Sequence, residues 1–346
     1  MGNKLKIGQI VSFGVGGADK CALNLIKGLL NLETDITVFY NKYSHPRIDE
    51  SETNPSRFDE YKTLPIKMIE FNHVSELNNY DIDILQTHRS GNDTWFLPDF
   101  ETTEFKFKVV ETNFHGYNQT KSDFRIYPSI TLTNHLQKTN IPYVVIPNPI
   151  NTTITNQNLR DELNLKHKFI YGRIGRPDSN IYSDINLRAY KKIESNDTCF
   201  LYMAPNQKAI EDAKKLEINN IIFLKPSSNE LDVSKFYNTI DVLCHSNSLG
   251  ETFGNTIAEA MINKKPVITH VGMESWPQAH RELVGDFTEL FVSDNIVENY
   301  SNLMLKLKND SSYYKMVSDY LKTRSDDLYD YINVSKKYLK LYKNLL

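Results

Sequence analysis

The alternation of short apolar strands with helical stretches along most of the chain is the feature that most constrains its fold. Strands that are apolar on both faces and separated by helices form parallel sheets with helices on either side. The 346 residues are enough for two such domains, each with its own core. We therefore predict an α/β protein with two parallel sheets, a first helix at 18–32 and a helical end from about 295. The predicted strands are 5–12, 35–41, 66–71, 83–88, 107–113 and 129–134 in the first half, and 168–175, 198–204, 221–225, 241–246, 266–270 and 288–294 in the second.

The segment 143–153, YVVIPNPINTT, is the best candidate for a linker between the two domains. Pro147 and Pro149 interrupt the strand and helix pattern there. We predict a first domain at 1–147 and a second at 148–324.

Composition excludes several classes of protein. The chain is 40% hydrophobic and 24% charged, with a net charge of −3. It has no long basic stripe, which argues against a nucleic-acid partner. Three scattered cysteines indicate thiols in a reducing compartment. We find no apolar run of membrane-spanning length and no signal-peptide pattern, so we expect a cytoplasmic protein.

The segment 246–269, SNSLGETFGNTIAEAMINKKPVIT, carries the strongest chemical signal. A glycine turn opens a helix, and the free N–H groups there suit a phosphate. Glu251 and Glu259 flank this turn, and their carboxylates can accept hydrogen bonds from ribose or sugar hydroxyls. An anion site between two hydroxyl acceptors predicts a nucleotide-sugar site. The backbone donors would come from Phe253, Gly254, Asn255 and Thr256.

The pattern E-x-F-G-x-x-x-x-E-A-M, followed by K-P-V-I, resembles the donor motif of family-4 (group 1) retaining glycosyltransferases. The resemblance implies the GT-B fold, in which two Rossmann-like domains face each other across a cleft, and no catalytic metal. It implies that Glu259 binds the donor ribose and Glu251 the transferred sugar. It also implies that the last helix, about 325–346, packs back on the first domain. The alternative is that both glutamates are solvated surface residues.

The segment 172–180, GRIGRPDSN, follows the first strand of the second domain. By the same resemblance, Arg173 and Arg176 would bind the donor diphosphate. The family's nearby lysine is missing, since Asp178 and Ile181 stand at the expected positions. Arginine can replace it chemically, or one arginine can simply pair with a surface carboxylate. Lys225 falls where family members pass the backbone beside the nucleobase.

A glycine turn at 13–20, FGVGGADK, lies between the first strand and the first helix. Asp19 breaks both the dinucleotide fingerprint and the Walker P-loop. The turn resembles the "GGAE" turn of family-4 enzymes, which implies that Gly16 and Gly17 approach the donor phosphate or the acceptor, with Asp19 beside them. A purely structural tight turn is the alternative.

Two histidines follow strands of the first domain, where open α/β sheets bind ligands. His115 matches a histidine that family members place near the reacting carbon of the sugar, and His88 matches a more variable position. Either could instead be a packed polar residue. Asp81 and Asp83 form a D-x-D triplet, but it precedes a strand, so we interpret it as a turn without a metal.

These observations predict a metal-independent retaining glycosyltransferase without a cofactor, with His115, Glu251 and Arg173 as catalytic residues. The donor would be a nucleotide sugar, with UDP or GDP as the favoured nucleotide. The acceptor would be a glycan, a lipid-linked molecule or another hydroxyl compound, which allows peripheral membrane contact. Two alternatives remain: a nucleotide-sugar epimerase of the same fold, and a non-catalytic protein that binds sugars or partners.

Overall fold

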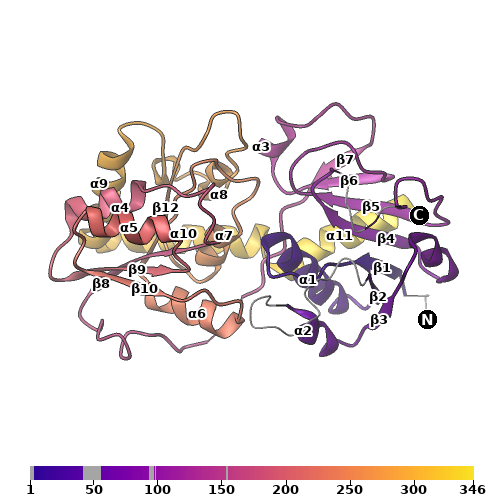
Figure 1. Cartoon of the computed structure of the whole chain (residues 1–346), viewed down its shortest axis with the longest axis horizontal. Coiled ribbons are helices and arrows are strands. Elements are labelled where there is room, and N and C mark those ends of the chain that lie inside the picture. Colours follow the sequence, from indigo (N-terminus) through magenta and orange to yellow (C-terminus); the bar gives the residue numbers. More distant parts are fainter. Residues whose placement is uncertain (1–3, 42–55, 93–96, 98, 153–154) are drawn as a thin grey trace. The chain divides into compact units, whose positions relative to one another are not determined.

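The structure is a computed structural model, and it describes residues 4–41, 56–92, 97, 99–152 and 155–346. The chain divides into two compact units (Figure 1). The first contains residues 1–150 and 328–346, and the second contains residues 151–327.

The first unit is built on a seven-stranded parallel sheet with strand order β3-β2-β1-β4-β5-β6-β7. Its buried strands alternate with helices in the chain, as the sequence pattern predicts. The strands are β1 (Lys6–Ile10), β2 (Asp35–Tyr40), β3 (Lys67–Glu70), β4 (Ile84–Arg89), β5 (Lys108–Asn113), β6 (Phe124–Tyr127) and β7 (Tyr143–Val145).

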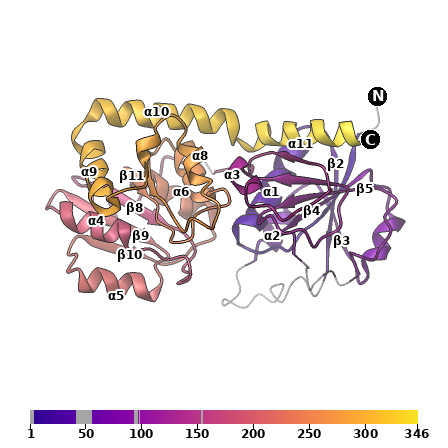
Figure 2. The same cartoon turned by 90° about the horizontal axis from the view of Figure 1, so that it is seen from above.

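Two helices far apart in sequence cover one face of this sheet. Helix α1 (Gly17–Leu30) packs beside the C-terminal helix α11 (Tyr331–Leu345) (Figure 1, Figure 2). The close approach depends on Gly28, since a Cβ there would lie 2.1 Å from Oγ of Ser335. Tyr338 and Tyr342 of α11 are fully buried. Their hydroxyl groups reach Thr112 and Gln86 of the sheet, at 3.0 and 2.7 Å.

Short elements complete the first unit. An apolar cluster that includes Phe39, Phe71, Leu85 and Phe100 fills the other face of the sheet. The remaining helices of this unit are α2 (Phe58–Lys62), η1 (Val74–Asn79) and α3 (Ile130–Thr133).

The second unit is built on a six-stranded parallel sheet with strand order β10-β9-β8-β11-β12-β13. Its strands are β8 (Phe169–Ile174), β9 (Thr198–Met203), β10 (Ile221–Leu224), β11 (Val242–Cys244), β12 (Val267–His270) and β13 (Phe291–Val292). Its helices are α4 (Ile185–Ile193), α5 (Gln207–Lys215), α6 (Glu230–Thr239), α7 (Asn255–Ile262), α8 (His280–Val284), η2 (Thr288–Leu290), α9 (Ile296–Asn309) and α10 (Ser311–Leu328).

The sequence prediction of a strand at 129–134 is wrong. Ser129 caps α3 instead, and its hydroxyl accepts a hydrogen bond from the backbone N–H of Leu132. The true strand there is β6, which lies a few residues earlier, and part of the predicted linker forms β7. A serine that satisfies a free helical N–H outweighs the β-propensity of the Ile and Thr residues that follow it.

Both sheets reverse their strand order at one point, between β1 and β4 in the first unit and between β8 and β11 in the second. Ligands of open α/β sheets bind at the carboxyl ends of the strands at such a point. The predicted site residues Asp19 and His88 follow β1 and end β4. In the second unit, Arg173 ends β8 and Glu251 follows β11. Each unit therefore brings its candidate residues to its own switch point, the place where the strand order of its sheet reverses.

Candidate active site

The loop from β11 to α7 is shaped by two glycines in the left-handed region. Gly250 has φ of 114° and Gly254 has φ of 106°, which side chains rarely allow. A Cβ at Gly250 would lie 2.6 Å from the carbonyl oxygen of Pro277. Gly254 is the N-cap of α7 and has no side chain with which to cap the helix. The turn therefore presents a helix N-terminus of the kind that binds anions.

Glu251 is held within this loop by side chain and backbone. Its Oε1 lies 3.0 Å from Nε2 of His245 and accepts a 2.9 Å hydrogen bond from the amide of Asn247. Its backbone pairs with the segment 277–279, through hydrogen bonds of 2.9 Å to Pro277 and from Ala279. Burial alone would raise the pKa of Glu251, but the hydrogen bonds from His245 and Asn247 lower it to about 2. The carboxylate is therefore ionised and fixed.

Arg173 is buried and supports the same loop from β8. Its guanidinium donates to the carbonyl oxygens of Ile174 and, at 3.0 Å, of Ser246. Its Nε has no hydrogen-bond partner among the described residues. Burial lowers the pKa of His245, and the positive charge of Arg173 lowers it further. Burial raises the pKa of Tyr237, and the charge of Arg173 opposes part of that rise. Arg173 thus supplies positive charge at the base of the loop, and its contact with the donor diphosphate stays a prediction.

Glu259 lies inside the second unit, with 5% of its surface exposed. Its Oε2 accepts a 2.9 Å hydrogen bond from the hydroxyl of Tyr237, which also lies 3.0 Å from the carbonyl oxygen of Thr256. Tyr237 therefore ties Glu259 to the first turn of α7. The surface-glutamate alternative is wrong for Glu259, because its carboxylate is buried and paired.

Arg176 and Lys225 lie at the edge of this cluster. Arg176 is 70% exposed, and its guanidinium lies 3.1 Å from the carboxylate of Asp178. The ion pair named as the alternative role for an arginine is therefore present, while phosphate binding by Arg176 stays a prediction. Lys225 is exposed and follows β10, the edge strand, two strands away from β8. No contact joins its side chain to the other candidate residues in the part of the chain that is described.

Three buried histidines behind Glu251 were missed at the sequence level. His245 follows β11, His270 ends β12 and His280 begins α8. Burial lowers the pKa values of all three, to about 4 for His270 and His280. The position of His245 and His270 at strand ends was a signal that could have found them, since such positions face the ligand edge of a parallel sheet.

In the first unit, the side-chain carboxylate of Asp19 lies within the glycine turn. Asp19, in the first turn of α1, accepts a hydrogen bond from the hydroxyl of Ser12. Its carboxylate fills the space over Gly14 and Gly16, where added Cβ atoms would lie 2.4 and 3.2 Å from Oδ2. Gly16 is the N-cap of α1 and has an ordinary extended conformation, and Gly17 begins the helix. The glycines make room for the Asp19 carboxylate, and the approach of Gly16 and Gly17 to the donor phosphate or the acceptor stays a prediction.

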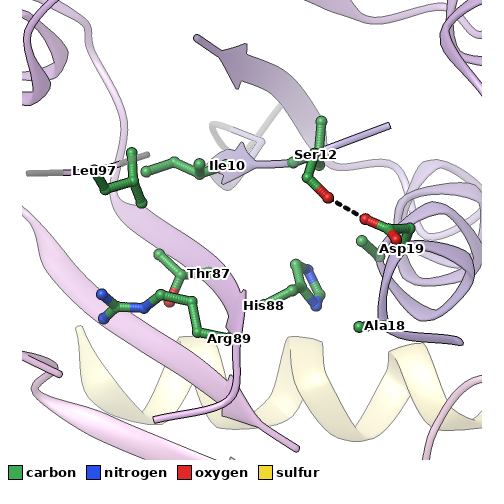
Figure 3. Close-up of a pocket in the computed structure, with 10 residues that line it drawn as sticks. Ile10, Ser12, Ala18, Asp19, Thr87, His88, Arg89 and Leu97 are labelled. Carbon is green, nitrogen blue, oxygen red and sulfur yellow. Dashed lines mark hydrogen bonds between the residues drawn. The ribbon is translucent and has the colours of Figure 1, made fainter. Parts of the chain in front are cut away.

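A small cavity of about 20 Å³ lies between this turn and the end of β4 (Figure 3). His88 lines it, and its Nε2 lies 3.0 Å from Oε1 of Gln9. Burial lowers the pKa of His88 to about 3, so the ring is neutral. Its Nδ1 and the hydroxyl of Thr87 have no hydrogen-bond partner among the described residues. A space of this size accommodates one water molecule or one hydroxyl group.

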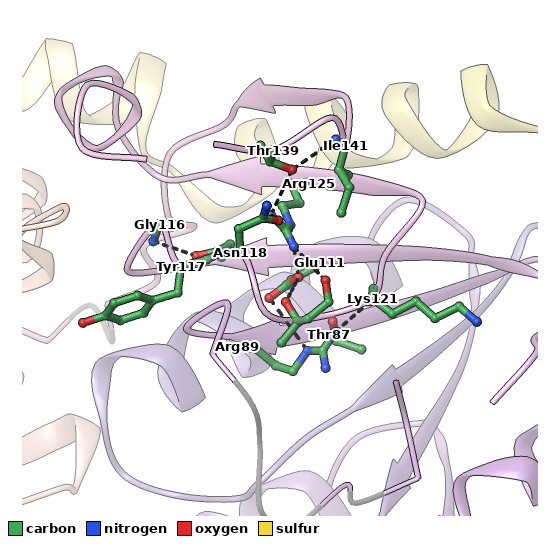
Figure 4. Close-up of polar contacts among 12 residues, drawn as sticks. Thr87, Arg89, Glu111, Gly116, Tyr117, Asn118, Lys121, Arg125, Thr139 and Ile141 are labelled. Carbon is green, nitrogen blue, oxygen red and sulfur yellow. Dashed lines mark hydrogen bonds and ion pairs between the residues drawn. The ribbon is translucent and has the colours of Figure 1, made fainter. Parts of the chain in front are cut away.

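His115 is exposed on the loop after β5, and its Nδ1 lies 2.8 Å from the hydroxyl of Ser90. A buried network holds this loop from below (Figure 4). Glu111 accepts a 2.7 Å bond from Thr120, and Arg125 donates at 2.7 Å to the carbonyl oxygen of Thr120. Glu111 and Arg125 are completely buried. His115 is therefore carried by a loop whose base is fixed.

The Asp81 and Asp83 triplet has structural partners. The Asp81 carboxylate pairs with the ammonium group of Lys6, and Asp83 accepts a 2.9 Å bond from the backbone N–H of the same residue. Both carboxylates fix the start of β1 beside β4.

Residues 156–324, which carry the cluster around Glu251 and Glu259, match the family model described as "Glycosyl transferases group 1". These residues form a group 1 glycosyl transferase domain. The chain is accordingly a glycosyltransferase, and the donor motif that suggested the family lies within the matched domain.

Solved structures share the fold of this glycosyltransferase over its whole length. A glycosyltransferase from Rickettsia africae ESF-5 has a TM-score of 0.78 at 17% identity and covers 99% of both chains. Anabaena Alr3699/HepE in complex with UDP and glucose has a TM-score of 0.74 at 14% identity, over 98% of this chain and 100% of that one. Sucrose-phosphate synthase from Thermosynechococcus elongatus has a TM-score of 0.72 at 16% identity, over 99% of both. The chain therefore has the GT-B fold.

No curated protein matches the sequence of this glycosyltransferase. Among the helices of the described residues, none combines the length and apolar character needed to span a bilayer.

Proposed function

We propose that this glycosyltransferase is a retaining enzyme that transfers a sugar from a nucleotide-sugar donor to a hydroxyl acceptor without a metal ion. The observation that carries the proposal is the cluster at the switch point of the group 1 domain. There Arg173, Glu251, Glu259 and the N-terminus of α7 surround one loop. Anabaena HepE, which shares the fold, was solved with UDP and glucose and with UDP-glucose.

In this proposal, the N-terminus of α7 receives the diphosphate and Glu259 binds the ribose. The ionised carboxylate of Glu251 accepts a hydrogen bond from the transferred sugar. Cleavage of the bond to the sugar leaves negative charge on the diphosphate, and the buried charge of Arg173 stabilises it. Preorganised positive groups in a buried site favour the transition state because they need no rearrangement when charge develops.

The first unit supplies the hydroxyl acceptor site in this proposal. The cavity beside His88 has room for one hydroxyl group, and the neutral ring and Thr87 offer it hydrogen bonds. The carboxylate of Asp19 disfavours a second anion there. His115 remains the proposed first-unit contributor to turnover, on its resemblance and on its place after β5.

The experiment that tests this function is a panel of UDP-, GDP-, ADP- and CMP-sugars incubated with candidate acceptors in EDTA. Product anomers are assigned by proton NMR. A product with the anomeric configuration of the donor supports a retaining transferase. An inverted product contradicts the retaining mechanism, and conversion of the sugar nucleotide without any acceptor supports the epimerase alternative.

A further inference from the structure

One oxygen of Glu251 is held by two donors, and the other has no hydrogen-bond partner among the residues that the structure describes. We propose that His245 is a positioning residue: with Asn247 it holds Oε1 of Glu251, so that Oε2 is presented to a hydroxyl of the transferred sugar. This inference rests on the proposed function, because that function assigns the sugar to Glu251.

The contacts divide cleanly between the two oxygens. Nε2 of His245 lies 3.0 Å from Oε1, and the Asn247 amide donates to the same atom at 2.9 Å. No described residue hydrogen-bonds to Oε2 of Glu251. The backbone of Glu251 is fixed by its pairing with the segment around Gln278. The carboxylate therefore has one preferred orientation, with a single acceptor oxygen available.

The surroundings of His245 select the tautomer that this role needs. Its Nδ1 lies 3.0 Å from the hydroxyl of Thr269 on β12, and its backbone N–H donates to Ile268 at 2.9 Å. The residue is 2% exposed, so water is not a ready substitute for either partner. A carboxylate accepts only, so Nε2 carries the proton and Nδ1 accepts from Thr269. The Thr269 hydroxyl thereby fixes the direction of the hydrogen bond to Glu251.

This arrangement has a consequence for the charge of Glu251. Burial favours the neutral carboxyl group, and the bonds from His245 and Asn247 oppose it. The other titratable and charged groups facing this pair are His280 from α8, His270 from β12 and Arg173 from β8. Their electrostatic effects remain when His245 loses its donor, but burial then acts on a carboxylate with one hydrogen bond fewer. The pKa of Glu251 should therefore rise in such a variant.

The test compares wild type with His245→Gln, His245→Phe and the control His280→Gln. A glutamine amide can replace the Nε2 donor, whereas phenylalanine cannot. His280 is also buried but bonds to the carbonyl oxygen of His270 and not to Glu251. We expect His245→Phe to lose turnover by about 10- to 100-fold, with nucleoside diphosphate affinity unchanged and a new acid limb in the pH profile. We expect His245→Gln to retain most turnover, and His280→Gln to keep wild-type turnover near neutral pH, where the His280 ring is uncharged.

A second measurement needs no donor and separates this inference from the proposed function. Carbon-13 NMR of labelled glutamate carboxyl groups, with Glu251 assigned through Glu251→Gln, gives its pKa in the unliganded protein. A higher pKa of Glu251 in His245→Phe than in wild type supports the positioning role of His245 even if no nucleotide sugar binds. An unchanged pKa, or equal turnover in His245→Phe and wild type, overturns it. If His245→Phe does not fold, Thr269→Val replaces it, since loss of that hydroxyl frees the tautomer and should also raise the pKa of Glu251.

Discussion

The guanidinium of Arg176 lies 3.1 Å from the carboxylate of Asp178, the residue that stands where the resemblance leads us to expect a lysine. Arg176 is 70% exposed, and exposed ion pairs of this kind contribute about 0–1 kcal/mol. A diphosphate can therefore compete for this arginine at little expense in stability.

We predict that Asp178→Asn strengthens the binding of nucleoside diphosphate, by roughly 1 kcal/mol, because it releases Arg176 and removes a negative charge near the anion. Asp178→Lys should strengthen it further. Calorimetry with the four nucleoside diphosphates in EDTA measures the effect. Asp212→Asn is a control that removes a carboxylate of the same unit, one paired with Tyr182 and Lys215. Unchanged affinity in both Asp178 variants would remove Arg176 from the site.

Glu259→Gln should weaken binding of nucleotide by about 1.5–3 kcal/mol if its carboxylate accepts a charged hydrogen bond from ribose. Tyr237→Phe removes the neighbouring hydroxyl but keeps the carboxylate, so it reports the effect of disturbing the α7 turn alone. Glu251→Gln should instead reduce affinity for the sugar nucleotide and turnover, with free nucleoside diphosphate bound almost normally. Equal losses for both ligands in Glu251→Gln and Glu259→Gln would contradict this division of roles.

His115→Ala should reduce turnover while donor affinity stays near that of wild type. The reason is that His115 belongs to the first unit, whereas the proposed donor residues belong to the second. The measurement pairs transfer rate at saturating donor with donor affinity on a folded variant. His135→Ala is the matched control, because His135 is also exposed in the first unit and its ring lies 2.9 Å from the carbonyl oxygen of Thr131 in α3. Full activity in His115→Ala would leave this residue without a catalytic role.

The folded protein should lose stability as the pH falls below about 6.5. Burial lowers the pKa of His88 to about 3 and those of His270 and His280 to about 4, from an ordinary value of 6.5. Between these values the unfolded chain binds protons that the folded chain does not. Each histidine therefore contributes a slope of up to about 1.4 kcal/mol per pH unit, and the stability is fully present above the ordinary value.

Urea unfolding at several pH values between 7.5 and 4.5 measures this slope. We expect His280→Gln to reduce the slope by up to about 1.4 kcal/mol per pH unit, because glutamine does not titrate. A slope that is identical in His280→Gln and wild type would show that this histidine does not titrate on unfolding.

Particular elements show what the sequence could predict about the fold. The glycine turn predicted the start of a helix, and α7 does begin at Asn255, directly after Gly254. Strand β6 was not among the predicted strands, and one of its four residues, Arg125, carries a charge. In the fold that arginine is buried against Glu111, so its charge is neutralised by a residue on the neighbouring strand. A pairing of this kind follows from strand order, which local sequence does not specify.

The candidate site was predictable where neighbours in sequence are also neighbours in space. Glu251 lies in the loop before α7 and Glu259 lies in α7 itself. Their spacing in the sequence was therefore enough to assign both to one site. His245 was missed because its role depends on Thr269 and on the fold of the loop back toward Glu251. The direct phosphate contact of Arg173 stays a prediction, whereas its buried hydrogen bond to the carbonyl oxygen of Ser246 depends on the three-dimensional fold.

The most direct test of the central claim, a nucleotide-sugar donor bound by the group 1 domain, is a thermal-shift panel of UDP-, GDP-, ADP- and CMP-sugars in EDTA. A ligand that binds only the folded state stabilises it by about 2.7 kcal/mol at one hundred times its Kd. The account predicts that at least one nucleotide sugar raises the Tm of wild type and raises it much less in Glu251→Gln and Glu259→Gln. No shift with any donor, or equal shifts in wild type and both variants, would contradict it.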